Sequence, residues 1–442
     1  MLIERLKKNP EVFEFYLQNG WSLISKVLIA FTGILMNYSI SKFYGASEVG
    51  LFAIFNSLIS FTSLFSTLGL NIYILKLIET TKKDFPDYSV NSILDKVVSI
   101  VASFSLIITL LIIVTRQQIG ELVFSQEALE IVIILAAIAI VPYSLYEMVQ
   151  ASFRGLRKAE KLIPVQLTLS ISKVTMVIVV ALMAGNFTIV LGLIIAITAL
   201  VAIWSMVLAR KLSRSEGNDP APKKYSLSLF KMKEIITDAS PLLLTASATL
   251  TISHADFLIL GYFMDVKAVG YYAVANKLAL TIALTLRSIN SSTGSLFSRY
   301  FVTNEKEKLK LTLKRTSRLS FLVSLPLALL YSIFGTDILG FFGEGFEIAF
   351  SSLLILTLAQ LFSSLSGSVG YFLNMTGYQK TYRNIVIISS VLNIILNIIL
   401  IPRYGIFGAA VATAFSILFN NLCSTIMIKK NFGFWSFGIY LK

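Results

Sequence analysis

The sequence of 442 residues contains one cysteine and one histidine, and only 14% of its residues are charged. The lone cysteine, Cys423, excludes a disulfide within the chain, and one cysteine with one histidine excludes the usual ligand sets of zinc sites. The sequence also lacks a Gly-rich phosphate loop of the Walker type, so direct use of ATP is not indicated. We therefore expect neither a metal nor a cofactor.

The sequence is rich in long apolar segments. Hydrophobic residues make up 56% of the chain, whereas soluble globular proteins carry about 25% charged residues. Many apolar segments reach the roughly 20 residues that cross a hydrocarbon core. The first of them meets no cleavage pattern, so we expect a retained span rather than a signal peptide. The composition predicts an all-α polytopic membrane protein.

Apolar windows bounded by charges, glycines or prolines predict about twelve transmembrane helices. They lie near residues 20–41, 49–75, 97–115, 131–152, 162–184, 187–209, 239–262, 268–296, 319–337, 348–376, 384–402 and 405–428.

Basic residues alternate between the connections of these spans. The two termini and every second connection hold 30 of the 38 Lys and Arg residues, the remaining connections hold 4, and the spans hold 4. Cytoplasmic segments carry such an excess of Lys and Arg. The pattern predicts a multi-pass protein of the cell inner membrane with both termini in the cytoplasm. It also accounts for the net charge of +14 without a nucleic-acid partner.

A segment rich in Ser, Pro and Lys divides the chain into halves. Residues 210–238 have the composition of a solvated cytoplasmic linker. We expect an N-terminal six-helix bundle over residues 1–209. A C-terminal six-helix bundle with a short cytoplasmic tail is expected over residues 239–442.

The two halves share a local sequence pattern. The stretch FYGASEVGLFAIFNSL at 43–58 matches FMDVKAVGYYAVANKL at 263–278 at an offset of 220 residues. Because six spans separate the copies, the two bundles would enter the membrane in the same orientation and form a parallel internal repeat. Transporters commonly have this organisation.

Three stretches carry a resemblance to a known family. They are FYGASEVGLFAI, DFLILGYFMDVKAVGYYAVANKL and LNIILNIILIPRYGIFGAAVATAFS. In these stretches the chain resembles the polysaccharide repeat-unit flippases that serve O-antigen and capsule synthesis, the Wzx type. Their wider superfamily also contains multidrug and toxin extrusion carriers and peptidoglycan-precursor flippases.

The resemblance implies two six-helix bundles around a cavity that opens alternately to the two sides of the bilayer. The implied cargo is an undecaprenyl-diphosphate-linked oligosaccharide, carried from the cytoplasmic to the outer leaflet. A proton or sodium gradient is a candidate energy source, and glycan polymerase machinery is a candidate partner.

Four basic residues fall inside predicted spans. A charged side chain near the bilayer centre costs about 2.5–3.5 kcal/mol on insertion scales, so it usually faces a cavity, a partner or the interface. One hypothesis is a cationic lining that binds the diphosphate of the substrate. The alternative is that these residues pair with internal polar groups for packing. The four candidates are Lys277, Lys173, Arg287 and Lys26.

The predicted seventh span contains the only histidine and a carboxylate. His254 and Asp256 lie two residues apart, about 200° around a helix, so we expect them to face different sides. Asp256 could balance Lys277, or bind the proton or sodium ion that drives transport. His254 could sense protons, although a lone histidine is more often a hydrogen-bonded packing residue.

Other polar residues within spans have a simpler expected role. Glu147 lies near the cytoplasmic end of its span, where Arg154 or Lys158 could pair with it. Asn393 and Asn397 share a helix face, as do Asn56 and Ser60, and such pairs commonly bind helices together in lipid.

Two other functions remain open. A drug or metabolite cation antiporter of the same fold would favour acidic groups inside the membrane, whereas the intramembrane residues here carry an excess of two positive charges. A membrane glycan polymerase or ligase would be an enzyme with large outward loops, and the external connections here are short. We therefore expect a transporter and not an enzyme.

Overall fold

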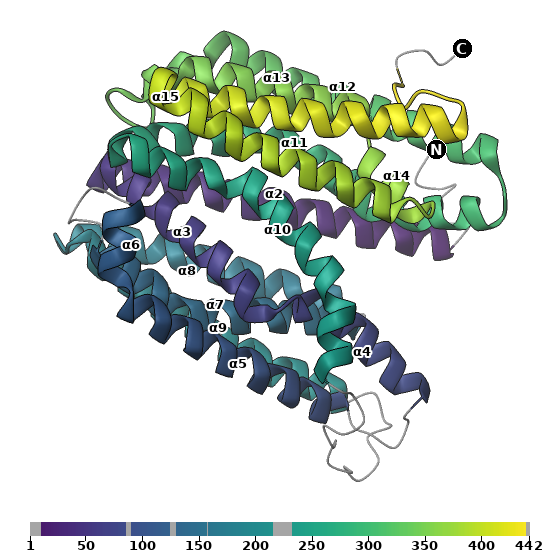
Figure 1. Cartoon of the computed structure of the whole chain (residues 1–442), viewed down its shortest axis with the longest axis horizontal. Helices are drawn as coiled ribbons and strands as arrows, with labels where there is room; N and C mark the ends of the chain where they lie inside the picture. Colours follow the sequence, from purple (N-terminus) through teal and green to yellow (C-terminus); the bar gives the residue numbers. More distant parts are fainter. Residues whose placement is uncertain (1–9, 85–89, 124–129, 157, 215–231, 439–442) are drawn as a thin grey trace. The chain divides into compact units, whose positions relative to one another are not determined.

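We analysed a computed structural model of the chain, which describes residues 10–84, 90–123, 130–156, 158–214 and 232–438 (Figure 1). Much of the predicted linker 210–238 therefore lies outside the described residues. The described residues form helices and connecting turns, with no strand among them. This confirms the predicted all-α class.

The helices follow one another along the whole described chain. They are α2 (Pro10–Tyr44), α3 (Ala46–Thr67), α4 (Leu70–Asp84), α5 (Val90–Val114), α6 (Arg116–Val123), α7 (Glu130–Gly155), α8 (Leu162–Leu182), α9 (Phe187–Arg214), α10 (Met232–Phe263), α11 (Val266–Val302), α12 (Lys306–Gly340), α13 (Phe350–Ser366), α14 (Val369–Met375) and α15 (Gln379–Phe432), with 3₁₀ turns at Ala159–Lys161 and Phe346–Ala349.

Eleven helical segments of the described chain are long and apolar enough to cross a membrane. Their outward faces carry large apolar side chains, such as Leu111, which is 60% exposed, and Ile107, which is 59% exposed. Such faces need lipid as their solvent because water would not solvate them. The chain is therefore a multi-pass membrane protein.

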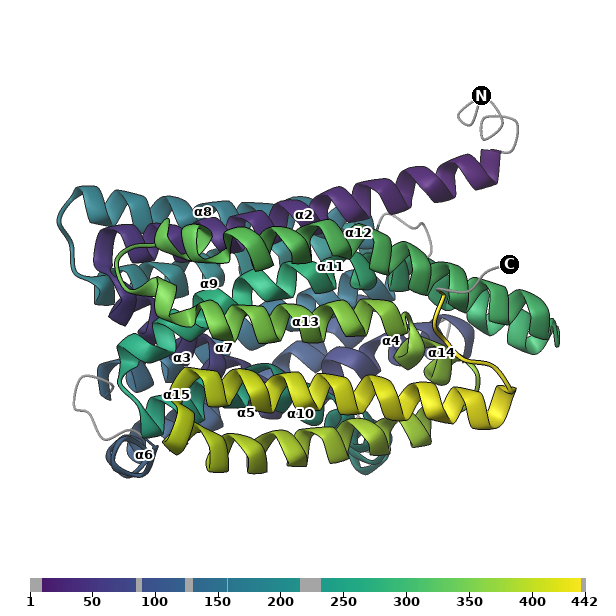
Figure 2. The ribbon, with the colours of Figure 1, turned by 90° about the horizontal axis from the view of Figure 1, so that it is seen from above.

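The longest helix, α15, contains two of the predicted spans. It has 54 residues and a non-helical backbone at Gly405, with φ 55° and ψ −133°. Only glycine adopts such a conformation readily. The two arms on either side of this bend lie next to each other (Figures 1 and 2). Each arm is long enough to cross a membrane, and the count of twelve crossings stays a prediction.

Polar contacts hold the two arms of α15 together. Asn397 donates to the backbone oxygen of Asn393 at 2.9 Å and to its side-chain oxygen at 3.1 Å. Asn393 in turn lies 3.5 Å from the Thr413 hydroxyl on the other arm. Both asparagines are fully buried. The expected role in helix association agrees with these contacts.

The helices form two compact units. One unit, here called the continuous unit, comprises Phe43–Val269; the other, the split unit, comprises α2 up to Lys42 together with Gly270–Lys442. Contacts thus group the first helix with the second half of the chain. The division into sequence halves at 209 and 239, and the internal repeat, stay predictions.

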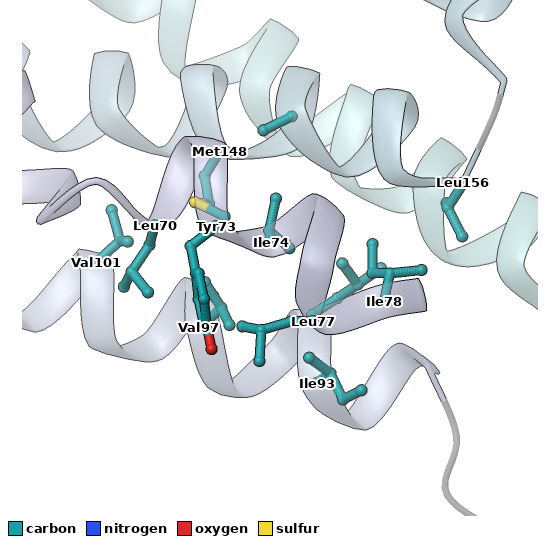
Figure 3. Packing of buried hydrophobic residues seen from close by; sticks show 12 residues of the cluster. Leu70, Tyr73, Ile74, Leu77, Ile78, Ile93, Val97, Val101, Met148 and Leu156 are labelled. Carbon is teal, nitrogen blue, oxygen red and sulfur yellow. The ribbon is translucent and has the colours of Figure 1, made fainter. Parts of the chain in front are cut away.

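The core of the continuous unit includes a cluster between α4, α5 and α7. Ile74 and Ile78 of α4 and Met148 of α7 are fully buried there, and Val97 of α5 is nearly so (Figure 3). Gly155, at the end of α7, allows α4 to approach, since a Cβ there would lie 2.7 Å from Ile78 Cδ1. Close packing of this kind fixes α4 as a separate helix after the break at Leu68 and Gly69.

The core of the split unit is aromatic at one end. Phe372 of α14 lies edge-on to Phe297 of α11 at 5.4 Å between ring centroids, and to Phe432 of α15 at 4.9 Å. Such edge-to-face pairs stabilise packing beyond the burial of area alone. The segment after α15 returns to α12, where the Gly438 amide donates to Ser317 at 3.2 Å.

Candidate functional site

Lys277 of α11 ends against the bare backbone of α2. A Cβ added at Gly33 would lie 2.8 Å from both Cε and Nζ of Lys277. The ammonium group therefore occupies the space that a side chain at position 33 would take. Both residues belong to the split unit.

A narrow crevice surrounds this contact. It is too narrow to hold a water molecule, and its walls come from α2, α11 and the turn after α12. Phe342 in that turn is fixed to α2, because Ser41 donates a hydrogen bond to its carbonyl oxygen and Tyr38 packs edge-on against its ring. The lining residues are Ile34, Asn37, Val274, Lys277, Leu278 and Phe342.

The crevice lies along one polar face of α2. Lys26, Gly33 and Asn37 are spaced by seven and four residues, so they lie on the same side of the helix. Asn37 donates to the backbone oxygen of Gly33 at 3.2 Å, and Lys26 is partly buried about 10 Å away along the helix axis. The face thus presents a second ammonium group on the side that contacts Lys277.

Lys277 makes no hydrogen bond or ion pair with any described residue; the ion pairs among the described residues lie elsewhere. Its side chain is partly buried among apolar neighbours. An uncompensated cation within a membrane span is costly. Among the described residues no hydrogen bond or ion pair supports the packing alternative for Lys277, and the substrate-binding role stays a prediction.

The other two predicted basic residues do not line this crevice, although the positive charge of Arg287 acts on Lys277. Arg287 follows Lys277 by ten residues on α11, which is about 15 Å along the axis and about 80° around it. Its side chain is exposed. Lys173 lies on α8 in the continuous unit, partly buried and without an ion pair among the described residues. The four cations therefore do not form one cluster within either unit.

His254 of α10 contacts α3. Its Nδ1 lies 3.2 Å from the hydroxyl of Ser57, which is fully buried. Ser57 also donates to the backbone oxygen of Ala53 at 2.8 Å. The histidine is thus hydrogen-bonded between two helices, and both its packing role and its proton-sensing role stay predictions.

Asp256 is buried, with 1% of its surface exposed. Its Oδ1 accepts a hydrogen bond from the backbone amide of Phe257 at 3.0 Å. The ring of the same Phe257 also contacts His254, with ring centroids 6.3 Å apart, and the expectation that Asp256 and His254 face different sides stays a prediction. The role of Asp256 in ion coupling stays a prediction.

Glu147 of α7 is partly buried. Its carboxylate and the guanidinium of Arg154 interact through their charges, as the expected local pairing requires, although Arg154 is exposed at the end of α7 and the two groups form no ion pair within 4 Å. Sequence reasoning missed Gly33, Asn37 and Ser57, whose roles depend on contacts between helices. For Gly33 and Asn37 a signal was available, because Gly33 follows Lys26 by seven residues and Asn37 follows Gly33 by four.

Comparison with known proteins places these helices in a common fold. A multidrug resistance transporter of the MATE family, MOP superfamily, solved in an inward-facing conformation, aligns with a TM-score of 0.75 at 12% identity, covering 93% of this chain and 98% of its own. The lipid II flippase MurJ in an inward closed conformation aligns with a TM-score of 0.67 at 18% identity. This alignment covers 94% of this chain and 87% of the MurJ chain. The chain has the fold of these transporters.

Sequence relatives cover only part of the chain. The Haloferax volcanii protein named "Probable low-salt glycan biosynthesis flippase Agl15" is 31% identical over 171 residues, which are 38% of this chain and 36% of that protein. The Bacillus subtilis protein named "Probable multidrug resistance protein YoeA" is 30% identical over 184 residues, 39% of each. The chain thus matches less than two fifths of the length of these relatives, which are named as a flippase and a resistance protein and not as enzymes.

A family model described as polysaccharide biosynthesis protein matches residues 40–346. This range covers more than half of the chain and includes α3 to α12, with Lys173, Asp256 and Lys277. The chain belongs to this polysaccharide biosynthesis protein family.

Proposed function

We propose that the chain is a flippase that moves an undecaprenyl-diphosphate-linked oligosaccharide repeat unit from the cytoplasmic to the outer leaflet by alternating access. The proposal rests on the family, on the transporter fold and above all on Lys277, whose ammonium group lies in the α2–α11 crevice without an acidic partner among the described residues. It places the protein in the cell inner membrane with both termini cytoplasmic.

The chemistry of the crevice suits a diphosphate. Ammonium groups form charge-assisted hydrogen bonds with phosphate oxygens, and Asn37 has amide protons that can add to them. Lys26, on the same face of α2, supplies a second cation about 10 Å from Gly33. In the present state the crevice is narrow, so substrate entry requires α2 and α11 to separate, as alternating access entails. Lys173 and Arg287 are proposed to contact the substrate in other states.

The sign of the charge argues against the nearest alternative. A drug or metabolite cation antiporter needs an acidic group in its path, and no carboxylate lines the α2–α11 crevice. That alternative retains support from the fold and from the resistance protein YoeA.

A proton or sodium gradient is the proposed energy source, with Asp256 as the coupling residue. Glycan polymerase machinery is the proposed downstream partner.

The test uses a strain from which the gene is deleted, with the intact chain or Lys277→Ala supplied in its place. We expect the deletion to lose surface glycan and to accumulate lipid-linked precursor on the cytoplasmic face. The intact chain should restore surface glycan, and Lys277→Ala should reduce it at least tenfold at equal membrane abundance. Both quantities are measured by surface staining and by extraction of the precursor pool.

Lys306→Ala is the matched control. Lys306 is exposed at the start of α12, away from the crevice, and it forms no ion pair among the described residues. The same loss of one ammonium group there should leave surface glycan unchanged. Normal glycan in the deletion strain, with increased drug sensitivity, would instead support the antiporter.

A further inference from the structure

A second polar surface lies in the continuous unit, on α7 and α8. Tyr143, Glu147 and Gln150 are spaced by four and three residues on α7, so they share one helix face. Gln166, Ser170 and Lys173 repeat the same spacing on α8. All six side chains are partly buried and none is fully buried. We call these six residues the α7–α8 polar face.

One hydrogen bond joins the two helices at one end of this face. Gln166 Nε2 donates to Gln150 Oε1 at 2.6 Å. Tyr143 lies seven residues before Gln150 on α7, and Lys173 lies seven residues after Gln166 on α8. Each is therefore about 10 Å along its helix from the glutamine pair. Tyr143 lies beside Ser60 of α3, so a third helix borders the face. The six residues therefore form two polar helix faces that meet at the pair of glutamines.

Apolar packing leaves this face free. α7 and α8 both pack on α9 through other residues, with Tyr146, Val165 and Leu169 buried against Val201. The polar side chains lie beside this core and do not form it. Helix association here is thus supplied largely by apolar contacts, although the single bond between the glutamines adds to it.

Most of the hydrogen-bonding capacity of the face is unused within the protein. Each glutamine amide has two donors and two lone pairs, yet the two amides share one bond and have no other side-chain partner among the described residues. Neither Glu147 nor Lys173 forms an ion pair there. Inside a membrane span, polar groups left in this way are costly unless they meet water or a ligand.

We propose that the α7–α8 polar face is the subsite that binds the sugar residues of the substrate, separate from the cationic crevice that binds its phosphates. The inference rests on the proposed flippase function. Sugar hydroxyls donate and accept hydrogen bonds, as do the amide, hydroxyl and phenol groups of this face. Glu147 accepts from hydroxyl groups, Lys173 donates to them, and the Tyr143 ring offers an apolar surface for sugar C–H groups.

The assignment predicts that the α7–α8 polar face and the cationic crevice bind different parts of the substrate. Contacts to sugar hydroxyls matter only when enough sugars are present to reach the face, and a polar site loses much of its affinity when its hydrogen bonds are removed. A substrate with one sugar should depend on the phosphate contacts alone. A substrate with a full oligosaccharide should depend on both sites.

The experiment measures flipping in proteoliposomes by purified full-length protein. Two fluorescent substrates are compared, polyprenyl diphosphate carrying one sugar and the same lipid carrying an oligosaccharide. The variant is the double substitution Gln150→Leu and Gln166→Leu, which removes both partners of the bond together and so leaves no unpaired group. We expect the oligosaccharide lipid to move at least tenfold more slowly and the one-sugar lipid to move within twofold of the wild-type rate.

Two matched variants complete the test. Gln117→Leu with Gln118→Leu makes the same chemical change at exposed positions of α6 and should leave both rates unchanged. Glu147→Gln keeps the shape of the face and should slow only the oligosaccharide lipid. Thermal unfolding of each variant shows whether a rate change accompanies a loss of stability.

The outcomes separate the two proposals. If the wild type moves neither lipid, the flippase function itself is wrong. If the wild type moves both lipids and the glutamine double variant moves both equally well, the sugar subsite is wrong while the flippase function stands. Equal slowing of both lipids together with a lower unfolding temperature would assign the glutamines to helix association and would also overturn the subsite.

Discussion

The ammonium group of Lys277 lies where the side chain of residue 33 would be. Gly33 provides this space, because a Cβ there would lie 2.8 Å from both Cε and Nζ of the lysine. Glycine is a poor residue for the interior of a helix, and α2 continues unbroken through this position. The contact gives the glycine a role, which is to let a long cationic side chain lie against the helix backbone.

Gly33→Ala should impair transport without impairing folding. The added methyl group displaces the flexible end of Lys277, which can move at low cost, whereas alanine favours the helix by about 0.5–1 kcal/mol. We expect surface glycan to fall at least fivefold while the unfolding temperature stays the same or rises. Glycan staining and thermal unfolding of the purified protein measure the two effects.

Gly192→Ala is the control for that substitution. Gly192 lies within α9, and a Cβ there would meet nothing within 4 Å. This variant gains the same helix preference and should transport normally. Equal glycan levels in the two variants would show that the position of the Lys277 ammonium does not matter.

Asp256→Asn should alter the dependence of transport on ion gradients. The substitution removes the charge but keeps an oxygen that can accept the hydrogen bond from the Phe257 amide. If Asp256 binds the driving ion, flipping in proteoliposomes should lose most of its response to an imposed proton or sodium gradient. An unchanged response would remove Asp256 from the coupling mechanism.

His254→Gln provides a comparison within the same helix. Glutamine can still donate to the Ser57 hydroxyl that lies 3.2 Å from His254 Nδ1, but it does not titrate. Since we interpret His254 as a packing residue, this variant should retain the gradient response of the wild type. Loss of the proton response in His254→Gln alone would assign proton coupling to the histidine.

Gly408→Ala should destabilise the protein through the bend of α15. A Cβ at Gly408 would lie 2.4 Å from the carbonyl oxygen of Leu400 on the other arm. Backbone atoms do not move aside as a side-chain end does, so the arms must separate and weaken the contact between Asn393 and Thr413. Overpacking of this kind typically costs about 1–3 kcal/mol. Thermal unfolding should show a clear decrease relative to Gly192→Ala.

Asp95→Asn should change stability only slightly. Asp95 of α5 accepts a hydrogen bond from Arg210 Nε of α9 at 3.0 Å, but the two side chains are 53% and 40% exposed. Exposed ion pairs contribute about 0.2–1 kcal/mol and are screened by salt. The small loss expected at low ionic strength should disappear at high salt. A loss as large as that of Gly408→Ala would contradict this view of the pair.

Much of the fold could be predicted because the signals of a membrane helix are local. The predicted span 162–184 corresponds to α8 at Leu162–Leu182, and 131–152 to α7 at Glu130–Gly155. The break at Gly69, between α3 and α4, was missed because the apolar run continues across it. A glycine within an apolar run does not by itself indicate whether the helix stops there.

The candidate site was predictable as a set of residue types but not as an arrangement. A lysine within a span indicates function because of its desolvation cost, and this singled out Lys277 and Lys173. The charge of Arg154 acts on Glu147 as expected, but spacing along one helix does not fix where a long side chain points, so a direct contact could not be predicted. The glutamines of the polar face were missed because Gln150 and Gln166 lie on different helices.

The sequence by itself determined that this chain is a helical membrane protein with basic residues in alternate connections. Apolar length and charge act within one segment at a time, and lipid requires every segment to satisfy its own backbone hydrogen bonds. Only the tertiary structure decided that Gly33 faces Lys277, that Gln150 meets Gln166 and that α2 joins the second half of the chain in one compact unit. These relationships depend on packing between segments far apart in the sequence, and no local pattern specifies which helix faces will meet.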